Sequence, residues 1–209
     1  MGEKQTGPLP TEFAPPKVDV RSLPGGGFLL RSPVPLGAYE KSLGALLRRR
    51  AKESPDRDFL AERDAGGSWR VLTYGEAGRL AEAIAQALID REMGPRRPLM
   101  ILSGNSVSHA LLMLGGFLAG VPVVPVSVAY SLLSQDFAKL RSIHREVRPA
   151  LVFAEDGGLF GRALQALDPD GAEIVTRVGA AEGIPATPWS RLIATSPTEA
   201  VEKAFASVG

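Results

Sequence analysis

The sequence alternates, over most of its length, between short uninterrupted apolar runs and longer segments with helical periodicity. Runs that are apolar at every position are typical of strands covered on both faces, as in a parallel sheet. Parallel neighbours need a crossover connection, which is usually a helix. The alternation therefore predicts an α/β fold, a parallel sheet flanked by helices. The expected strands are Leu99–Leu102, Val121–Val126, Ala150–Ala154 and Ala172–Thr176.

Helix-start signals divide the chain between these strands. Thr73 stands three residues before Glu76, the spacing of a capping box, and apolar positions recur behind it to near Gly94. The last helix is expected to begin with Ser196 as its cap and Pro197 as its first residue. Other helices are predicted from Ser42 to Pro55, from Asn105 or Ser106 to Gly120, from Ser134 to Pro149, from Asp156 through Leu167, and around Trp189–Ile193.

The N-terminal part is different in composition. Residues 1–41 are rich in proline and are predicted to form an extended leader, with a hairpin of Val18–Arg21 and Phe28–Arg31. Residues 42–209 are predicted to form the α/β lobe. This lobe includes a second hairpin, in which Ala65-Gly66-Gly67 joins Asp58–Arg63 to Trp69–Thr73.

Composition excludes several classes of function. The chain has 24 Lys and Arg against 23 Asp and Glu, so it lacks the basic excess of a nucleic-acid or anionic-membrane binder. Without cysteine it has no disulfide, thiolate nucleophile or Cys-ligated metal. Its N-terminus has no apolar signal core. Its most apolar stretch, residues 110–126, is shorter than the ~20 residues of a spanning helix. We expect a cytoplasmic protein.

Ligand sites of open parallel sheets lie at the carboxyl ends of the strands. There, Ser103–His109 could bind an anion at a helix N-terminus or simply cap the helix, and the cap preferences of Ser and Asn favour capping. Ser127–Ser131 could line a pocket or cap the next helix, and both interpretations stay open. His109 is expected to be a satisfied polar residue. His144 and the Arg48–Arg50 run are expected on solvated helix faces.

Motif searches identify no site residue. Neither G-x-G-x-x-G between a strand and a helix nor G-x-x-x-x-G-K-[ST] occurs, so no phosphate cradle is recognised. The sequence assigns no catalytic, cofactor-binding or metal-ligating residue.

Two segments nevertheless resemble a known family. Leu72–Ala77 is similar to the Leu-Thr-Tyr-x-Glu-Leu motif of the adenylate-forming superfamily, which includes acyl- and aryl-CoA synthetases, luciferases and adenylation domains of peptide synthetases. Leu118–Val126 resembles the second motif of that superfamily, Leu-Lys-Ala-Gly-x-x-Tyr-Val-Pro, and Ser103–Ser106 stands where the family has a helix start. Within the superfamily the chain most resembles feruloyl-CoA synthases, through Leu29–Gly37, Phe59–Arg63 and Ser127–Ser131.

The resemblance implies the first lobe of the large N-terminal domain of an acid–CoA ligase. Such enzymes activate a carboxylic acid, here an aryl acid, with Mg·ATP to an acyl-adenylate and pass the acyl group to CoA. The family's phosphate loop lies downstream of the second motif. We therefore expect ATP, Mg and CoA to belong to the full-length enzyme and none to bind this chain, which alone would be inactive.

The resemblance to an acid–CoA ligase also implies which protein surfaces this lobe would contact. The remainder of the parent polypeptide would cover this lobe, and an exposed lobe face could lead to self-association. The alternative is a free-standing, non-enzymatic α/β module that binds a ligand near Ser127–Ser131. A nucleotide-binding enzyme with an unrecognised site is a third possibility.

Overall fold

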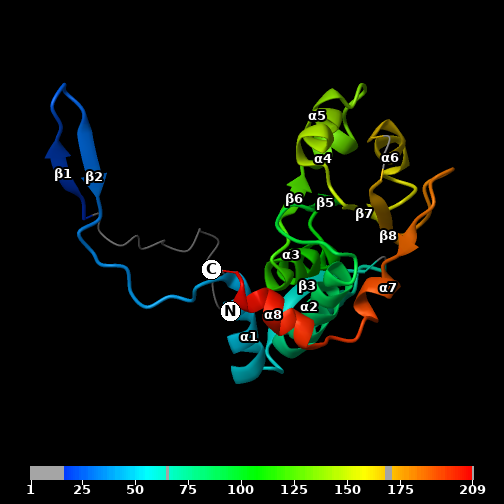
Figure 1. Cartoon of the computed structure of the whole chain (residues 1–209), viewed down its shortest axis with the longest axis horizontal. Helices are drawn as coiled ribbons and strands as arrows, with labels where there is room; N and C mark the ends of the chain where they lie inside the picture. The colour runs from blue at the N-terminus through cyan, green and yellow to red at the C-terminus, as the bar shows by residue number, and fades with distance from the viewer. Residues whose placement is uncertain (1–16, 65, 168–170, 209) are drawn as a thin grey trace, which may run out of the picture. The chain divides into compact units, whose positions relative to one another are not determined.

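A computed structural model describes residues 17–64, 66–167 and 171–208, and the chain divides into two units between Tyr39 and Glu40 (Figure 1). In the first unit, β1 (Asp19–Ser22) pairs antiparallel with β2 (Phe28–Arg31). Gly25 and Gly26 turn the chain with φ of 92° and 88°, which glycine adopts without strain. The predicted N-terminal hairpin is confirmed; residues 1–16 of the predicted leader lie outside the described residues.

The second unit alternates helices and strands as the apolar pattern predicts. Its sheet has the order β6-β5-β7-β8-β9, and every pair in it is parallel. A separate antiparallel hairpin, β3–β4, is also confirmed. The elements are α1 (Leu43–Glu53), β3 (Asp58–Arg63), β4 (Trp69–Thr73), α2 (Tyr74–Ile89), β5 (Leu99–Leu102), α3 (Val107–Ala119), β6 (Val123–Val126), α4 (Val128–Ser131), α5 (Ala138–Val147), β7 (Leu151–Asp156), α6 (Gly161–Leu167), β8 (Glu173–Val178), β9 (Thr187–Pro188), α7 (Ser190–Ile193) and α8 (Glu199–Ala206).

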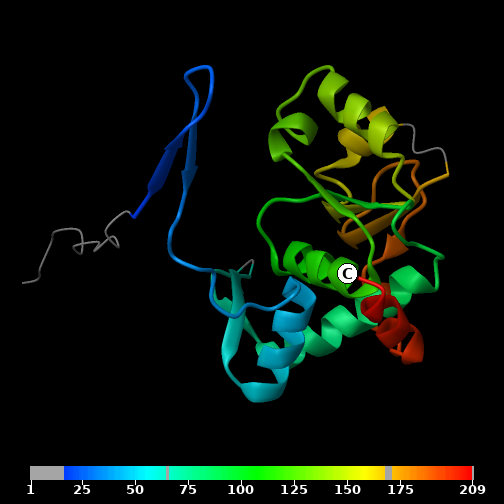
Figure 2. The same ribbon diagram turned by 60° about the vertical axis from the view of Figure 1, so that its left-hand side comes forward.

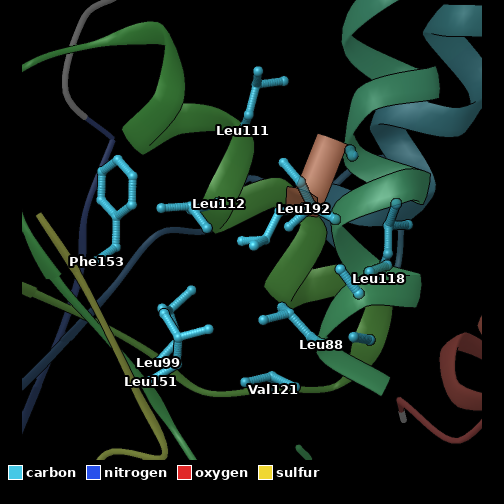
Figure 3. Close-up of a cluster of buried hydrophobic side chains, with 14 of the residues drawn as sticks. Leu88, Leu99, Leu111, Leu112, Leu118, Val121, Leu151, Phe153 and Leu192 are labelled. Atoms are coloured by element: carbon cyan, nitrogen blue, oxygen red, sulfur yellow. The ribbon is translucent and has the colours of Figure 1, made fainter. Parts of the chain in front are cut away.

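Helices cover both faces of this sheet, which is why its central strands are apolar throughout (Figure 2). Leu99 and Ile101 of β5 face α2 and α3, whereas Met100 and Leu102 face α5 and α6. Figure 3 shows Leu88 of α2 and Leu112 of α3 gathered over Leu99 and Leu151. The predicted α/β class with a parallel sheet is confirmed.

Helices α2 and α3 approach each other closely because α3 has no side chain at the contact. A Cβ added to Gly115 would lie 2.5 Å from Cγ2 of Ile84 and 3.2 Å from the carbonyl oxygen of Ala81. On the adjacent residue, a Cβ at Gly116 would lie 2.3 Å from Cγ2 of Val123 in β6. The two glycines therefore let α3 contact a helix and the sheet at the same level.

Arg48 joins three helices and does not lie on a solvated face as predicted. Its Nε donates to Glu82 of α2 at 2.8 Å and its Nη1 to Glu202 of α8 at 2.9 Å. Its guanidinium lies 4.4 Å from the ring centroid of Phe205, and its side chain is only 24% exposed. Burial raises the pKa of Glu82, against the opposing effect of Arg48.

Several element boundaries differ from the sequence prediction. The cap of α8 is Thr198 instead of Ser196, so Pro197 precedes the helix; Thr198 donates its N–H and its hydroxyl to Oε1 of Gln86, each at 2.8 Å. Helix α2 ends at Ile89, before Gly94, and α5 begins only after Phe137, whose φ is 52°. The short α4 and the two-residue β9 were not expected.

His144 is also placed differently from the prediction of a solvated face. The side chain is half-buried, and its Nε2 is buried without a hydrogen-bond partner among the described residues. This burial lowers the pKa of the imidazole.

No helix in the described ranges is both long enough and apolar enough to cross a membrane.

We predict that Arg48→Ala lowers the free energy of unfolding by about 2 kcal/mol, because it leaves Glu82 half-buried and unpaired; the effect is smaller than for a fully buried pair because Arg48 is partly exposed. Arg50→Ala is the matched control and should change stability by less than about 0.5 kcal/mol, since Arg50 has only a 3.9 Å contact with Glu53 at the surface. Urea denaturation measures both. Equal losses in the two variants would contradict the bridging role of Arg48.

Candidate functional site

Polar side chains from three neighbouring strands meet at the carboxyl edge of the sheet. Leu102 of β5, Ala154 of β7 and Thr176 of β8 are aligned in the strand register. The next residue along each strand is therefore brought to the same edge. These residues are Ser103, Glu155 and Arg177.

Glu155 is the centre of this group. Its Oε2 accepts a hydrogen bond from the hydroxyl of Ser106 at 2.9 Å and lies 3.4 Å from Oγ of Ser103. Its Oε1 accepts from Nε of Arg177. The Glu155 side chain is only 15% exposed, so its charge is balanced mainly by this arginine and by the hydroxyl.

The N-terminus of α3 opens onto the same group and is occupied by oxygen atoms of the protein. The N–H of Val107 donates to Oε2 of Glu62 at 2.7 Å, and the N–H of His109 donates to Oγ of Ser106 at 3.1 Å. Glu62, on β3, forms an ion pair with Arg70 across the hairpin. Ser106 thus caps the helix, as the preferred interpretation of Ser103–His109 predicts. With Glu62 and Glu155 beside it, this helix end disfavours an anion.

The histidine in this segment has a structural contact. Nδ1 of His109 lies 3.1 Å from the carbonyl oxygen of Gly104, and the side chain is partly exposed. His109 is therefore a satisfied polar residue, as predicted.

Ser127–Ser131, left open by the sequence, forms helix α4. Oγ of Ser127 accepts from the N–H of Ala129 at 3.3 Å, and the ring of Tyr130 packs against Nζ of Lys139 at 5.1 Å from its centroid. The structure thus uses Ser127 as a cap.

The turn after β7 is held by one side chain and by a close approach of two backbone segments. Oδ1 of Asp156 accepts from the N–H groups of Gly158 and Leu159 at 2.9 and 3.0 Å, which begins the turn into α6 as predicted. A Cβ at Gly157 would lie 2.9 Å from the backbone of Ala180 and Ala181. The backbones of two loops therefore touch at this turn.

The start of α3 is partly occupied by acceptors from the protein itself. In the first turn of α3, the N–H groups of Val107 and His109 are already bonded to Glu62 and Ser106. No group of three or more His, Asp or Glu side chains within the described ranges could hold a metal ion. The edge is a set of internal contacts that fixes strand ends and a helix start.

Sequence reasoning found Ser103 and Ser106 but missed the groups that bind them. Glu155 follows a buried apolar run directly, and this position is a usable signal in an α/β chain. Glu62 carries no such signal, because it reaches the edge from a hairpin outside the parallel sheet.

We predict that Ser106→Ala lowers the free energy of unfolding by about 1 to 2 kcal/mol, since it removes a helix cap and a hydrogen bond to a mostly buried carboxylate. Ser127→Ala is the matched control; it removes a single cap contact on a four-residue helix and should cost about 0.5 kcal/mol or less.

A third variant, Ser106→Asp, separates the capping function from the bond to Glu155. Aspartate is normally an effective cap, but here a second carboxylate would face Glu155. Ser106→Asp should therefore be no more stable than Ser106→Ala in chemical denaturation. Full stability of Ser106→Asp would show that Glu155 does not constrain this position.

One family model matches most of the second unit. The family model described as AMP-binding enzyme matches residues 47–203. Among curated proteins, a probable non-canonical nonribosomal peptide synthetase, CymA of Salinispora arenicola (strain CNS-205), is 33% identical over 89 residues, which make up 43% of this chain and 1% of that protein.

Two of the similar solved structures are ligases. The fatty acyl-adenylate ligase from L. pneumophila, in complex with acyl adenylate and pyrophosphate, is 21% identical with a TM-score of 0.54, over 75% of this chain and 25% of that one. A benzoate CoA ligase from Burkholderia xenovorans LB400 is 24% identical with a TM-score of 0.58, over 74% of this chain and 29% of that one. At these identities the likeness shows a shared fold, and the chain spans between a quarter and a third of either structure.

Proposed function

The chain belongs to the AMP-binding enzyme family, and on that premise we propose that it forms the first lobe of the large N-terminal domain of a carboxylic acid–CoA ligase that works through an acyl-adenylate. We further propose that the acid is an aryl acid, as in feruloyl-CoA synthases. The benzoate CoA ligase among the similar structures supports a CoA ligase of aryl acids. The resemblance of Leu29–Gly37, Phe59–Arg63 and Ser127–Ser131 supports the narrower choice.

One observation carries the proposed role of the lobe: the first family motif, Leu72–Ala77, is used to build the fold. Oγ1 of Thr73 accepts from the N–H of Glu76, whose carboxylate accepts from the N–H of Thr73, so the two residues cap α2. The ring of Tyr74 stacks on Phe59 at 4.3 Å and ties the helix to β3.

The second motif, Leu118–Val126, has a matching structural role. Gly120 ends α3 with a φ of 66°, a left-handed conformation that favours glycine. Val121 donates its N–H to the carbonyl of Gly116 at 2.9 Å and is buried before β6 begins. The contacts of both motifs therefore support the proposed scaffold role.

In enzymes of this class ATP supplies the adenylyl group, and stabilising the charge on its phosphates is most of what catalysis requires. At the carboxyl edge of this sheet, the carboxylates of Glu155 and Glu62 already accept bonds from the hydroxyl of Ser106 and the N–H of Val107. We therefore propose that residues 1–209 alone do not catalyse adenylation, and that they position other parts of an enzyme.

The first test is pyrophosphate exchange into ATP by the 209-residue chain with ferulate, benzoate or a fatty acid. We expect no exchange above the enzyme-free blank with any of them. Exchange that depends on one of these acids would contradict the scaffold role.

The second test replaces the matching segment of the benzoate CoA ligase by residues 47–203. If the lobe is a scaffold, a chimera that melts cooperatively should keep benzoate-dependent exchange, because the host supplies the phosphate-binding residues. A folded but inactive chimera would contradict the proposal, and the unaltered ligase is the control.

A further inference from the structure

A pocket lies at the amino-terminal edge of the sheet, opposite the polar group around Glu155. It is bordered by the residues that precede β5, β7 and β8 and by the C-terminal ends of α5 and α6. We call it the amino-edge pocket and define it by its basic lining residues, Arg97, Arg141, His144, Arg145 and Arg148.

The fold brings these side chains together from two elements. Arg97 comes just before β5, whereas the others come from α5 and its cap. On a helix, residues three and four apart share a face, which places Arg141, His144 and Arg145 on one side. Arg148 ends α5 in a left-handed conformation with a φ of 48°, which is uncommon for a residue with a side chain.

Charge distinguishes the amino-edge pocket from the other polar pocket of this unit. The pocket between α1 and α2 is lined by Arg48, Lys52 and Arg79, and it is balanced by Asp56, Glu76 and Glu82. The amino-edge pocket has no acidic residue among its described lining residues. The only ion pair of these five side chains within the described ranges is a 3.7 Å contact between Arg97 and Glu92, whose side chain is 89% exposed. Among the described residues, four arginines therefore line one pocket; Asp168 and Asp170, between the lining residues Leu167 and Gly171, lie outside the described residues.

A structural explanation covers only part of this cluster. Cations near a helix C-terminus stabilise the helix dipole, which explains Arg145 in the last turn of α5. It does not explain Arg97, which comes from another element.

We propose that the amino-edge pocket binds a small soluble compound that carries phosphate groups. Guanidinium groups form paired hydrogen bonds with phosphate oxygens, and several of them in one concave site suit a polyphosphate better than a single carboxylate. This site is independent of the proposed scaffold role of the lobe, which rests on the two family motifs.

The test is a titration of the ¹⁵N-labelled 209-residue chain with inorganic pyrophosphate, with sodium chloride adjusted to hold ionic strength constant. We expect saturable shifts of the amides of Ala150 and Ala166, which line the pocket. Pyrophosphate should bind at least about tenfold more tightly than sulfate, because it offers more oxygens to the same guanidinium groups. No saturable shift, or equal affinity for sulfate, would overturn the proposal.

Variants separate a site from general charge attraction. Arg141→Gln combined with Arg148→Asn should weaken pyrophosphate binding about tenfold or more; asparagine tolerates the left-handed conformation at 148. Lys52→Gln combined with Arg79→Gln removes the same charge from the balanced pocket and should change the affinity less than twofold. Thermal melting confirms that both variants fold. Equal weakening by the two pairs would overturn the proposal.

A vesicle-sedimentation experiment distinguishes a soluble phosphate compound from a lipid headgroup as the ligand. The chain should not sediment together with vesicles that contain phosphatidic acid. The arginines of a concave pocket cannot contact the phosphates of a flat headgroup layer. Sedimentation that is lost in the Arg141/Arg148 variant would overturn the choice of a soluble ligand.

Discussion

The contact of α2 with α3 determines how the rest of the second unit is arranged. Gly115 lets α3 approach Ile84 and the backbone of Ala81 so closely that one layer of two helices covers one face of β5 and β7. Helix α2 also bonds to the two outer helices: Glu82 accepts from Arg48 of α1, and Gln86 accepts from Thr198 at the start of α8. Helix α3, fixed in the same contact, brings Ser106 to the carboxyl edge. A displacement of this helix pair would therefore loosen both the outer helices and the polar group around Glu155.

The two ends of the sheet differ in charge. At the carboxyl edge, Glu62 and Glu155 are each compensated by an arginine and bonded to helix donors. At the amino edge, arginines gather without an acidic lining residue among those described. The chain belongs to a family of adenylate-forming enzymes. Its two family motifs lie where β4 leads into α2 and where α3 ends before β6. These contacts are the basis of the proposal that the lobe acts as a support for other parts of an enzyme.

The sequence was sufficient for the α/β class, both hairpins and most strand positions, because uninterrupted apolar runs and capping residues act locally. What it did not predict depends on contacts between distant segments. Thr198 replaces Ser196 as the cap of α8 because Gln86, on another helix, binds it. Arg48 and His144 look like surface residues in a periodicity pattern, yet α8 covers the first and the sheet edge half-buries the second. Glu155 could be found from its position after a strand, but Glu62 could not, since only the fold brings its hairpin to α3.

The most direct test of the scaffold account observes the amides of Val107 and His109 by ¹⁵N NMR while Mg·ATP is added to the chain. If Glu62 and Ser106 occupy these donors as the structure indicates, the two resonances should stay in place at millimolar nucleotide, whatever happens at the amino edge. A saturable shift of both resonances, abolished by Ser106→Ala, would mean that the start of α3 accepts a phosphate, and the account of a closed carboxyl edge would be wrong.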